Sequence, residues 1–284
     1  MATAAAAQAF THFAVAPLTP RIGAEIEGID LRQELSDEVI AEIYRALLTY
    51  KVIFLRDQDI TQEQHVAFAR RYGELDVHPM TTNERIPEMH HLKSTPTHTT
   101  KGDTWHADLT WRETPSLGSI LRGRTTPEIG GDTLFVDMAA AYEGLSPGMK
   151  EWVCTLTAVH DASVFAVRAA QLGKTLDVAI PEPQEHPVVI THPDTGERIL
   201  FVNRSFTQRI KDLSEKESAW LLDHLYAQAS IPDYQCRFRW RSNSVAFWDN
   251  RACQHYAVGD YLPAPRHLER VTIVGNKPFF DPER

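Results

Sequence analysis

The chain has few cysteines and no long apolar run. Its three cysteines among 284 residues, Cys154, Cys236 and Cys253, have unrelated spacings, which excludes a disulfide framework and a zinc ribbon. No Lys or Arg precedes Arg21, so the basic segment of a secretory signal is missing. No stretch approaches the roughly 18 apolar residues of a membrane-spanning helix. These absences predict a soluble, cytoplasmic protein without a membrane partner, whose residues 1–9 form a frayed tail.

Basic residues are also in the minority. The chain has 29 Lys and Arg against 38 Asp and Glu, a formal net charge of −9, which argues against a nucleic-acid partner. No glycine-rich phosphate loop is found, because Gly130-Gly131-Asp132-Thr133 is too short for a dinucleotide fingerprint. In contrast, 43% of the residues are hydrophobic and 26 are Trp, Phe or Tyr (6, 12 and 8). This content predicts one folded domain over residues 1–284.

Capping signals and apolar patterns predict a few helices in the first third of the chain. Ser36 is suited to cap a helix over residues 37–50, and Thr61-x-x-Gln64 is a capping box that opens a helix ending near Gly73. Short strands are expected within residues 18–30 and over residues 52–55.

The remainder predicts mainly strands. The turn His192-Pro193-Asp194-Thr195-Gly196 joins two apolar runs as a hairpin, residues 245–248 and 271–274 read as strands, and Ser214 begins another helix. The fold class is therefore mainly β with flanking helices, a barrel or sandwich core. Residues 81–104 and 162–185 are predicted as lid loops.

Candidate metal ligands follow from the pattern His-x-Asp, which places an imidazole and a carboxylate on one face of an extended segment. Two segments match it, His106-Ala107-Asp108 and His192-Pro193-Asp194. In the second, the Asp is better explained as a turn former. The first lies in an apolar, aromatic setting between Trp105 and Trp111, where an Asp beside a His favours a bound cation.

A third ligand is expected at His255, which follows a predicted strand and a polar turn. Two histidines and one carboxylate with open positions form the facial triad of non-haem Fe(II) oxygenases. Zinc could occupy the same three ligands, so the trio alone does not fix the reaction.

Two arginines near the C-terminus indicate an anionic ligand. If residues 266–272 form a strand, Arg266, Leu268, Arg270 and Thr272 share one face. Two inward guanidinium groups need anionic partners, such as a carboxylate, sulfonate or sulfate. The alternative is that Arg266 is solvated and Arg270 pairs with a nearby Glu.

With these residues the chain resembles the taurine dioxygenase and 2,4-dichlorophenoxyacetate dioxygenase (TauD/TfdA) family of Fe(II)/2-oxoglutarate-dependent enzymes. The likeness covers nearly the whole chain in ordered motifs: Ile22-Gly23-Ala24, Phe54-Leu55-Arg56-Asp57-Gln58, Arg71-Tyr72-Gly73-Glu74-Leu75, Trp105-His106-Ala107-Asp108, Gly130-Gly131-Asp132-Thr133, His192-Pro193-Asp194-Thr195-Gly196, Phe201-Val202-Asn203 and Trp248-Asp249-Asn250-Arg251-x-x-x-His255.

This resemblance implies a double-stranded β-helix, a jelly roll of the clavaminate synthase type, with helices outside. It implies iron held by His106, Asp108 and His255, and 2-oxoglutarate bound by Thr133 and Arg266. Substrate contacts are implied for His78, Phe206 and Arg270. The cofactors would be Fe(II), 2-oxoglutarate as cosubstrate and O₂. Relatives form dimers or tetramers, so a homodimer or homotetramer is expected.

The implied reaction hydroxylates a C–H bond next to the anionic head of a small organic acid and releases succinate and CO₂. Departures from the taurine enzymes occur at Thr81, where they have Tyr, at Gly102-Asp103-Thr104, and after His160-Asp161, where an aromatic residue is expected but Ala162-Ser163-Val164-Phe165 follows. A larger sulfonate, an alkyl sulfate or an aryloxyalkanoate is therefore expected to fit at least as well as taurine, in a role such as sulfonate catabolism.

Three alternatives remain at this point. A zinc-dependent hydrolase could use the same trio. A non-catalytic jelly-roll binding protein would keep Arg270 but tolerate loss of His106. A biosynthetic oxygenase of the same family could act on an amino-acid-derived acid. The pairing of Thr133 with Arg266 argues against the first two, because it suits a dicarboxylate cosubstrate.

Overall fold

A computed structural model describes residues 9–77, 85–95, 103–171 and 180–284. Its largest element is a seven-stranded sheet in the order β1-β2-β3-β13-β5-β15-β4. All neighbouring strands in it are antiparallel except β2 and β3. The strands are β1 (Ala14–Pro17), β2 (Ala24–Glu27), β3 (Val52–Leu55), β4 (Met89–Ser94), β5 (Ser116–Thr125), β13 (Val245–Asp249) and β15 (Arg266–Val274).

A second, three-stranded sheet faces the large one across an aromatic core. Its strands are β6 (Thr133–Asp137), β12 (Gln235–Phe238) and β14 (Cys253–Ala257), in the order β12-β6-β14. Phe54 of β3 stacks on Phe238 of β12 with 3.9 Å between ring centroids, and its edge meets Phe135 of β6. Two sheets packed face to face in this way confirm the predicted jelly roll.

Helices cover the outer side of the large sheet. Helix α1 (Asp37–Tyr50) and α2 (Gln62–Arg70) begin at the predicted caps Ser36 and Thr61, the latter with a complete capping box. Their apolar faces pack on the strand residues that point away from the aromatic core. Strand β3 is therefore buried on both faces, which explains its unbroken apolar run.

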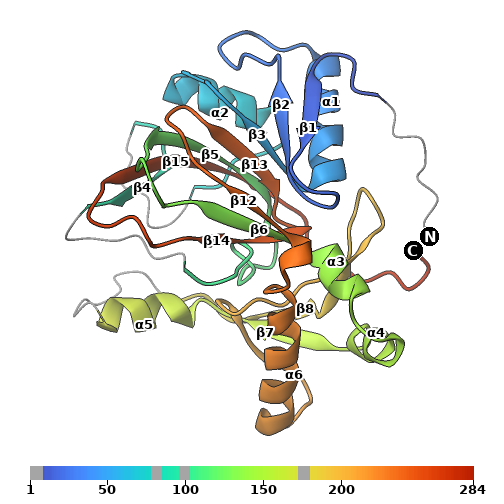
Figure 1. The fold of residues 1–284 in the computed structure, drawn as a ribbon. Helices are drawn as coiled ribbons and strands as arrows, with labels where there is room; N and C mark the ends of the chain where they lie inside the picture. Colours follow the sequence, from blue (N-terminus) through green and yellow to red (C-terminus); the bar gives the residue numbers. More distant parts are fainter. Residues whose placement is uncertain (1–8, 78–84, 96–102, 172–179) are drawn as a thin grey trace.

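The other elements lie beyond the smaller sheet, as Figure 1 shows. Helix α6 (Glu215–Gln228) begins at Ser214, and the predicted hairpin forms from β9 (Val189–Thr191) and β10 (Arg198–Leu200). The remaining elements are α3 (Met138–Glu143), α4 (Pro147–Val153), α5 (Ser163–Gln171), a short 3₁₀ turn η1 (Pro232–Tyr234), and a three-stranded sheet of β7 (Thr157–His160), β8 (Gln184–Pro187) and β11 (Thr207–Ile210). None of the helices described in the structure is long and apolar enough to cross a membrane.

The predicted loops are wrong over part of their length. Residues 81–104 include β4, which pairs with β15 at the edge of the large sheet. Residues 162–185 include α5 and the first part of β8. Within these ranges, residues 81–84, 96–102 and 172–179 lie outside the described part of the chain, as do residues 1–8 of the predicted tail. A lid role for either segment stays a prediction.

Candidate active site

The structure brings His106, Asp108 and His255 together, and we call them the inner trio. One ligand atom from each lies within 4.8 Å of the others. The backbones of His106 and His255 form an antiparallel bridge, with N–H···O distances of 3.2 and 2.9 Å. This bridge sets the two rings 4.2 Å apart at their centroids, and His106 Nε2 lies 3.8 Å from Asp108 Oδ1. The bridge joins the segment before β5 to β14.

Both imidazoles are prepared to act as ligands. Nδ1 of His106 is 2.7 Å from the Thr104 carbonyl oxygen. In the tautomer that donates this hydrogen bond, Nε2 keeps its lone pair. Burial, together with the neighbouring His106, lowers the pKa of His255 to about 3, so its ring is neutral at pH 7. Among the described residues, none hydrogen-bonds to the His255 ring, and its Nδ1 is buried. A bound metal would complete this donor set, and Fe(II) suits two imidazoles and a carboxylate.

Asn250 fixes the backbone that carries the carboxylate. The Asp108 N–H donates to Asn250 Oδ1 at 2.7 Å, and Asn250 Nδ2 donates to the Asp108 carbonyl at 2.8 Å. Asn250 is 1% exposed. The next residue, Leu109, has a φ of 59°, in the left-handed region that few side chains adopt. The amide therefore holds Asp108 at a sharp turn.

One pocket is lined by both histidines of the inner trio and by the two arginines that were predicted to bind anions. Thr133, Arg266 and Arg270 line it with apolar side chains from both sheets. The Thr133 hydroxyl accepts a hydrogen bond from the Trp240 indole at 2.9 Å, so its own proton is directed toward another acceptor. Burial lowers the pKa of Arg266, yet an arginine stays charged at neutral pH.

Arg266 contacts the turn that precedes β6. Its Nε donates to the Gly131 carbonyl at 3.1 Å, and no carboxylate in the described part of the chain lies within salt-bridge distance of its guanidinium. Gly131 has a φ of 68°, and a Cβ there would stand 3.3 Å from Arg266 Cδ. The motif Gly130-Gly131-Asp132-Thr133 is thus explained by a close approach of backbone to arginine.

Arg270 lies directly beside the inner trio. Its Nη1 donates to Asp108 Oδ2 at 2.9 Å, while its buried Nε has no hydrogen-bond partner among the described residues. A buried donor of this kind is costly unless a ligand accepts from it. Arg270 thus pairs with Asp108, and not with a nearby Glu as the alternative interpretation expected. Its guanidinium can still donate to a bound anion.

An apolar cluster adjoins the trio. Leu109, Trp111, Ala162 and Phe206 pack together, and the Phe206 and His106 rings are 6.4 Å apart. Phe165 joins them with its ring centroid 5.9 Å from Phe206. Phe165, four residues after Asp161, therefore supplies an aromatic side chain to this cluster, although the sequence departs from the taurine enzymes here. Phe165 lies in the first turn of α5, and its ring reaches the cluster.

Two other candidates from the sequence, the segment His192-Pro193-Asp194 and His78, are not part of the inner trio. Asp194 receives hydrogen bonds from Tyr44 and Arg251, and its N–H approaches His192 Nδ1 in the turn. His192 Nε2 lies 3.0 Å from Asp249. The second His-x-Asp segment therefore serves a structural network. His78, Thr81 and Gly102 lie outside the described residues, so the substrate contact of His78 stays a prediction.

The sequence did not single out Asn250 or Trp240 as site residues. Asn250 stood in a quoted motif without a role, and Trp240 stood in no motif. Both act through contacts between segments more than 100 residues apart. The only available signal was the polar Asp249-Asn250-Arg251 turn after an apolar strand.

A jelly roll with two histidines, one carboxylate and an adjoining pocket is typical of the non-haem Fe(II) oxygenases. Residues 14–272 match the model of the family described as "Taurine catabolism dioxygenase TauD, TfdA family". The chain is 36% identical to an α-ketoglutarate-dependent sulfate ester dioxygenase of Pseudomonas putida over 93% of this chain and 90% of that protein. It is 35% identical to an alkylsulfatase of Acinetobacter baylyi, over 91% and 84%.

A solved taurine dioxygenase of Burkholderia xenovorans has a TM-score of 0.84 to the chain at 38% identity, covering 96% of this chain and 95% of that one. The chain therefore belongs to the TauD, TfdA family. It is a dioxygenase that depends on Fe(II), 2-oxoglutarate and O₂. The alternative of a zinc-dependent hydrolase is not favoured by these relatives.

Proposed function

We propose that the enzyme hydroxylates the carbon next to the anionic head of an organic acid with an apolar body, and that alkyl sulfate esters are its preferred class. The observation that carries this proposal is the position of Arg270, beside Asp108 on one side and within the pocket on the other. The apolar cluster of Leu109, Trp111 and Phe206 offers a surface for a hydrocarbon chain. A sulfate ester dioxygenase among the relatives supports the same class.

The geometry supports a role for each of these residues. His106, Asp108 and His255 would hold Fe(II), with Asn250 fixing Asp108. When bound, the iron supplies O₂ activation coupled to the oxidative decarboxylation of 2-oxoglutarate. Thr133 and Arg266 would hold the distal carboxylate of 2-oxoglutarate, and apolar side chains such as Leu268 would exclude water.

The products follow from the chemistry of the oxidised carbon. An alkyl sulfate, O₂ and 2-oxoglutarate would give a hydroxylated ester, succinate and CO₂. The hydroxylated carbon would then carry two oxygens, and its C–O bond to sulfate would break as the hydroxyl proton leaves. An aldehyde and inorganic sulfate would result. Arg270 would orient the sulfate so that this carbon faces the inner trio.

The test is substrate-coupled succinate and sulfate release with octyl sulfate and with taurine. We expect octyl sulfate to give the higher kcat/KM and one sulfate per succinate. Replacing Arg270→Gln should abolish coupling for both anions, and Phe206→Ala should raise the KM for octyl sulfate roughly tenfold. Arg204→Gln, an exposed arginine on the surface, is the matched control and should change neither. A preference for taurine would overturn the proposed substrate class.

A further inference from the structure

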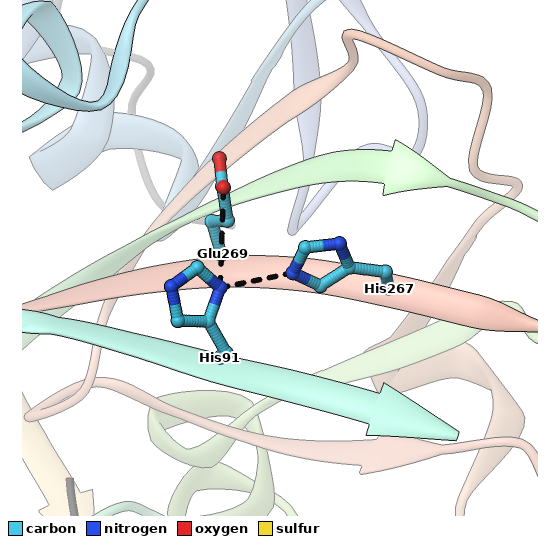
Figure 2. A group of neighbouring side chains, drawn as sticks. All are labelled: His91, His267 and Glu269. Atoms are coloured by element: carbon cyan, nitrogen blue, oxygen red, sulfur yellow. Dashed lines mark hydrogen bonds and ion pairs between the residues drawn. The ribbon is translucent and has the colours of Figure 1, made fainter. Parts of the chain in front are cut away.

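A second group of metal-ligating side chains lies on the other face of β15. We call His91, His267 and Glu269 the outer trio (Figure 2). One ligand atom from each lies within 4.8 Å of the others. His91 Nδ1 is 2.9 Å from His267 Nε2 and 3.9 Å from Glu269 Oε1. We propose that the outer trio binds a divalent ion of the zinc, nickel or copper class, separate from the iron site.

Strand register creates the outer trio. Glu269 of β15 stands opposite His91 of β4, and His267 lies two residues before Glu269 on the same face. Arg266, Leu268 and Arg270 alternate with them and line the pocket. The two trios therefore share no residue, although β15 carries members of the outer trio and the anion-binding groups of the pocket.

The distances suit one ion. Metal–nitrogen bonds of about 2.1 Å let two ligand atoms stand up to about 4.2 Å apart. The separations of 2.9 and 3.9 Å fall within this span. For the remaining pair, His267 and Glu269, the ligand atoms lie within 4.8 Å of each other.

Burial favours the neutral form of both imidazoles of the outer trio. Burial lowers the pKa of His91, and it lowers that of His267, with Lys93 adding to the effect. Neutral rings offer lone pairs to a metal, whereas protonated rings would repel it. Two imidazoles with a carboxylate favour zinc, nickel or copper over magnesium or calcium.

The carboxylate is held in place by a helix residue. Glu269 is 2% exposed, and its Oε1, which faces His91, accepts a hydrogen bond from Gln62 of α2 at 2.6 Å. Such outer contacts orient metal ligands. Its Oε2 lies on the side of Arg122 and Arg124, at 4.0 and 3.8 Å.

These two cations reduce the affinity for a metal without closing the site. Arg122 already donates to Asp59 and Asn243 at 3.0 and 2.7 Å. Arg124 has a 41% exposed side chain, so solvent screens its charge. The alternative explanation of the outer trio is a hydrogen bond between the two imidazoles, and the experiment separates the two.

The test measures the zinc content of the full chain after equilibrium dialysis against Zn²⁺ alone. We expect two ions in the wild type and one when the inner trio is removed by His106→Ala with His255→Ala. His267→Gln, which keeps a polar side chain, should also bind one ion. Combining all three substitutions should leave none. His224→Ala, at an exposed position of α6, should keep both ions.

Two results would overturn the proposal. One is that the variant without the inner trio binds no zinc. The other is that adding His267→Gln to it removes none. The anaerobic visible absorption band of Fe(II) with 2-oxoglutarate checks that His267→Gln is folded, because that band depends on the inner trio. If this variant does not fold, His91→Gln tests the same prediction.

Discussion

The inner and outer trios have the same donors, two imidazoles and one carboxylate, on opposite sides of one sheet. Their neighbours differ. The inner trio shares its pocket with Thr133, Arg266 and Arg270, so anions can reach it. The outer trio lies beside α2, and Arg122 and Arg124 approach its carboxylate at 4.0 and 3.8 Å. The ligand atoms determine which metal ions can bind, whereas the neighbouring residues determine whether a substrate can reach the metal and react.

Arginine stands near both carboxylates but with different consequences. Arg270 approaches Asp108 at 2.9 Å and has a buried Nε without a partner among the described residues. Arg122, beside Glu269, is fully buried and its Nε also has no partner among the described residues, but its Nη groups donate to the Ile60 carbonyl, Asp59 and Asn243. Arg270 lines the pocket of the inner trio, whereas the Nη groups of Arg122 are bound within the fold. We therefore expect activity at one trio only.

The largest difference is expected in turnover. His255→Ala should abolish substrate-coupled succinate release, because it would remove one of the three proposed iron ligands. His267→Gln should leave the rate within about twofold, as for changes remote from the chemistry. Succinate release measured at saturating Fe(II) and 2-oxoglutarate makes the comparison. Wild-type turnover in His255→Ala would refute the iron assignment, and loss of turnover in His267→Gln would mean that the two faces are coupled.

Acid should lower the stability of the protein through a buried histidine on the side of the sheet that carries the outer trio. His65 of α2 is fully buried, with its Nε2 3.1 Å from the Ile120 carbonyl oxygen, and burial lowers its pKa to about 4. The unfolded chain, with a pKa near 6.5, binds a proton that the folded chain does not. Stability is therefore fully present above pH 6.5 and falls as the pH drops toward 4, by up to about 3 kcal/mol.

Urea unfolding at pH 7.5 and pH 4.5 checks this loss. His65→Gln should be less stable at pH 7.5 but should lose less stability on acidification than the wild type does. His224→Gln, exposed on α6, should behave as the wild type. An unchanged acid response in His65→Gln would mean that other groups cause the loss.

The support of the inner carboxylate should also be measurable. Asn250→Ala removes both hydrogen bonds to the Asp108 backbone. We expect Fe(II) affinity to fall roughly 10- to 100-fold, the usual effect of losing an outer contact to a metal ligand. Anaerobic titration of the Fe(II)–2-oxoglutarate absorption band gives the affinity. Asn276→Ala, at an exposed position, is the control, and equal affinities in both variants would remove Asn250 from the site.

Local signals predicted the parts of the fold that depend on nearby residues. The caps at Ser36, Thr61 and Ser214 begin helices where expected, because each cap bonds to a backbone three residues away. The two-residue alternation of strands predicted that Arg266 and Arg270 share a face. The inner trio was also found from spacing and from the family motifs.

Long-range pairing produced what the sequence did not show. Residues 89–94 read Met-His-His-Leu-Lys-Ser, which lacks a clear strand pattern, and they form β4 because β15 supplies its hydrogen-bond partners. The outer trio exists only through this pairing. The ring of Phe165 likewise reaches the apolar cluster because residues 163–171 form α5, whereas the sequence predicted a loop there.

The smallest predicted effect concerns the charge beside the outer trio. Arg124→Gln removes a guanidinium whose Nε is 3.8 Å from Glu269 Oε2. Because this side chain is partly exposed and screened, zinc affinity at the outer trio should rise only about two- to fivefold. Zinc titration in the variant that lacks His106 and His255 measures it, with Arg209→Gln, exposed on β11, as the control. Weaker zinc binding in Arg124→Gln would instead show that Arg124 orients the Glu269 carboxylate. The carboxylate of each trio would then be positioned by an arginine.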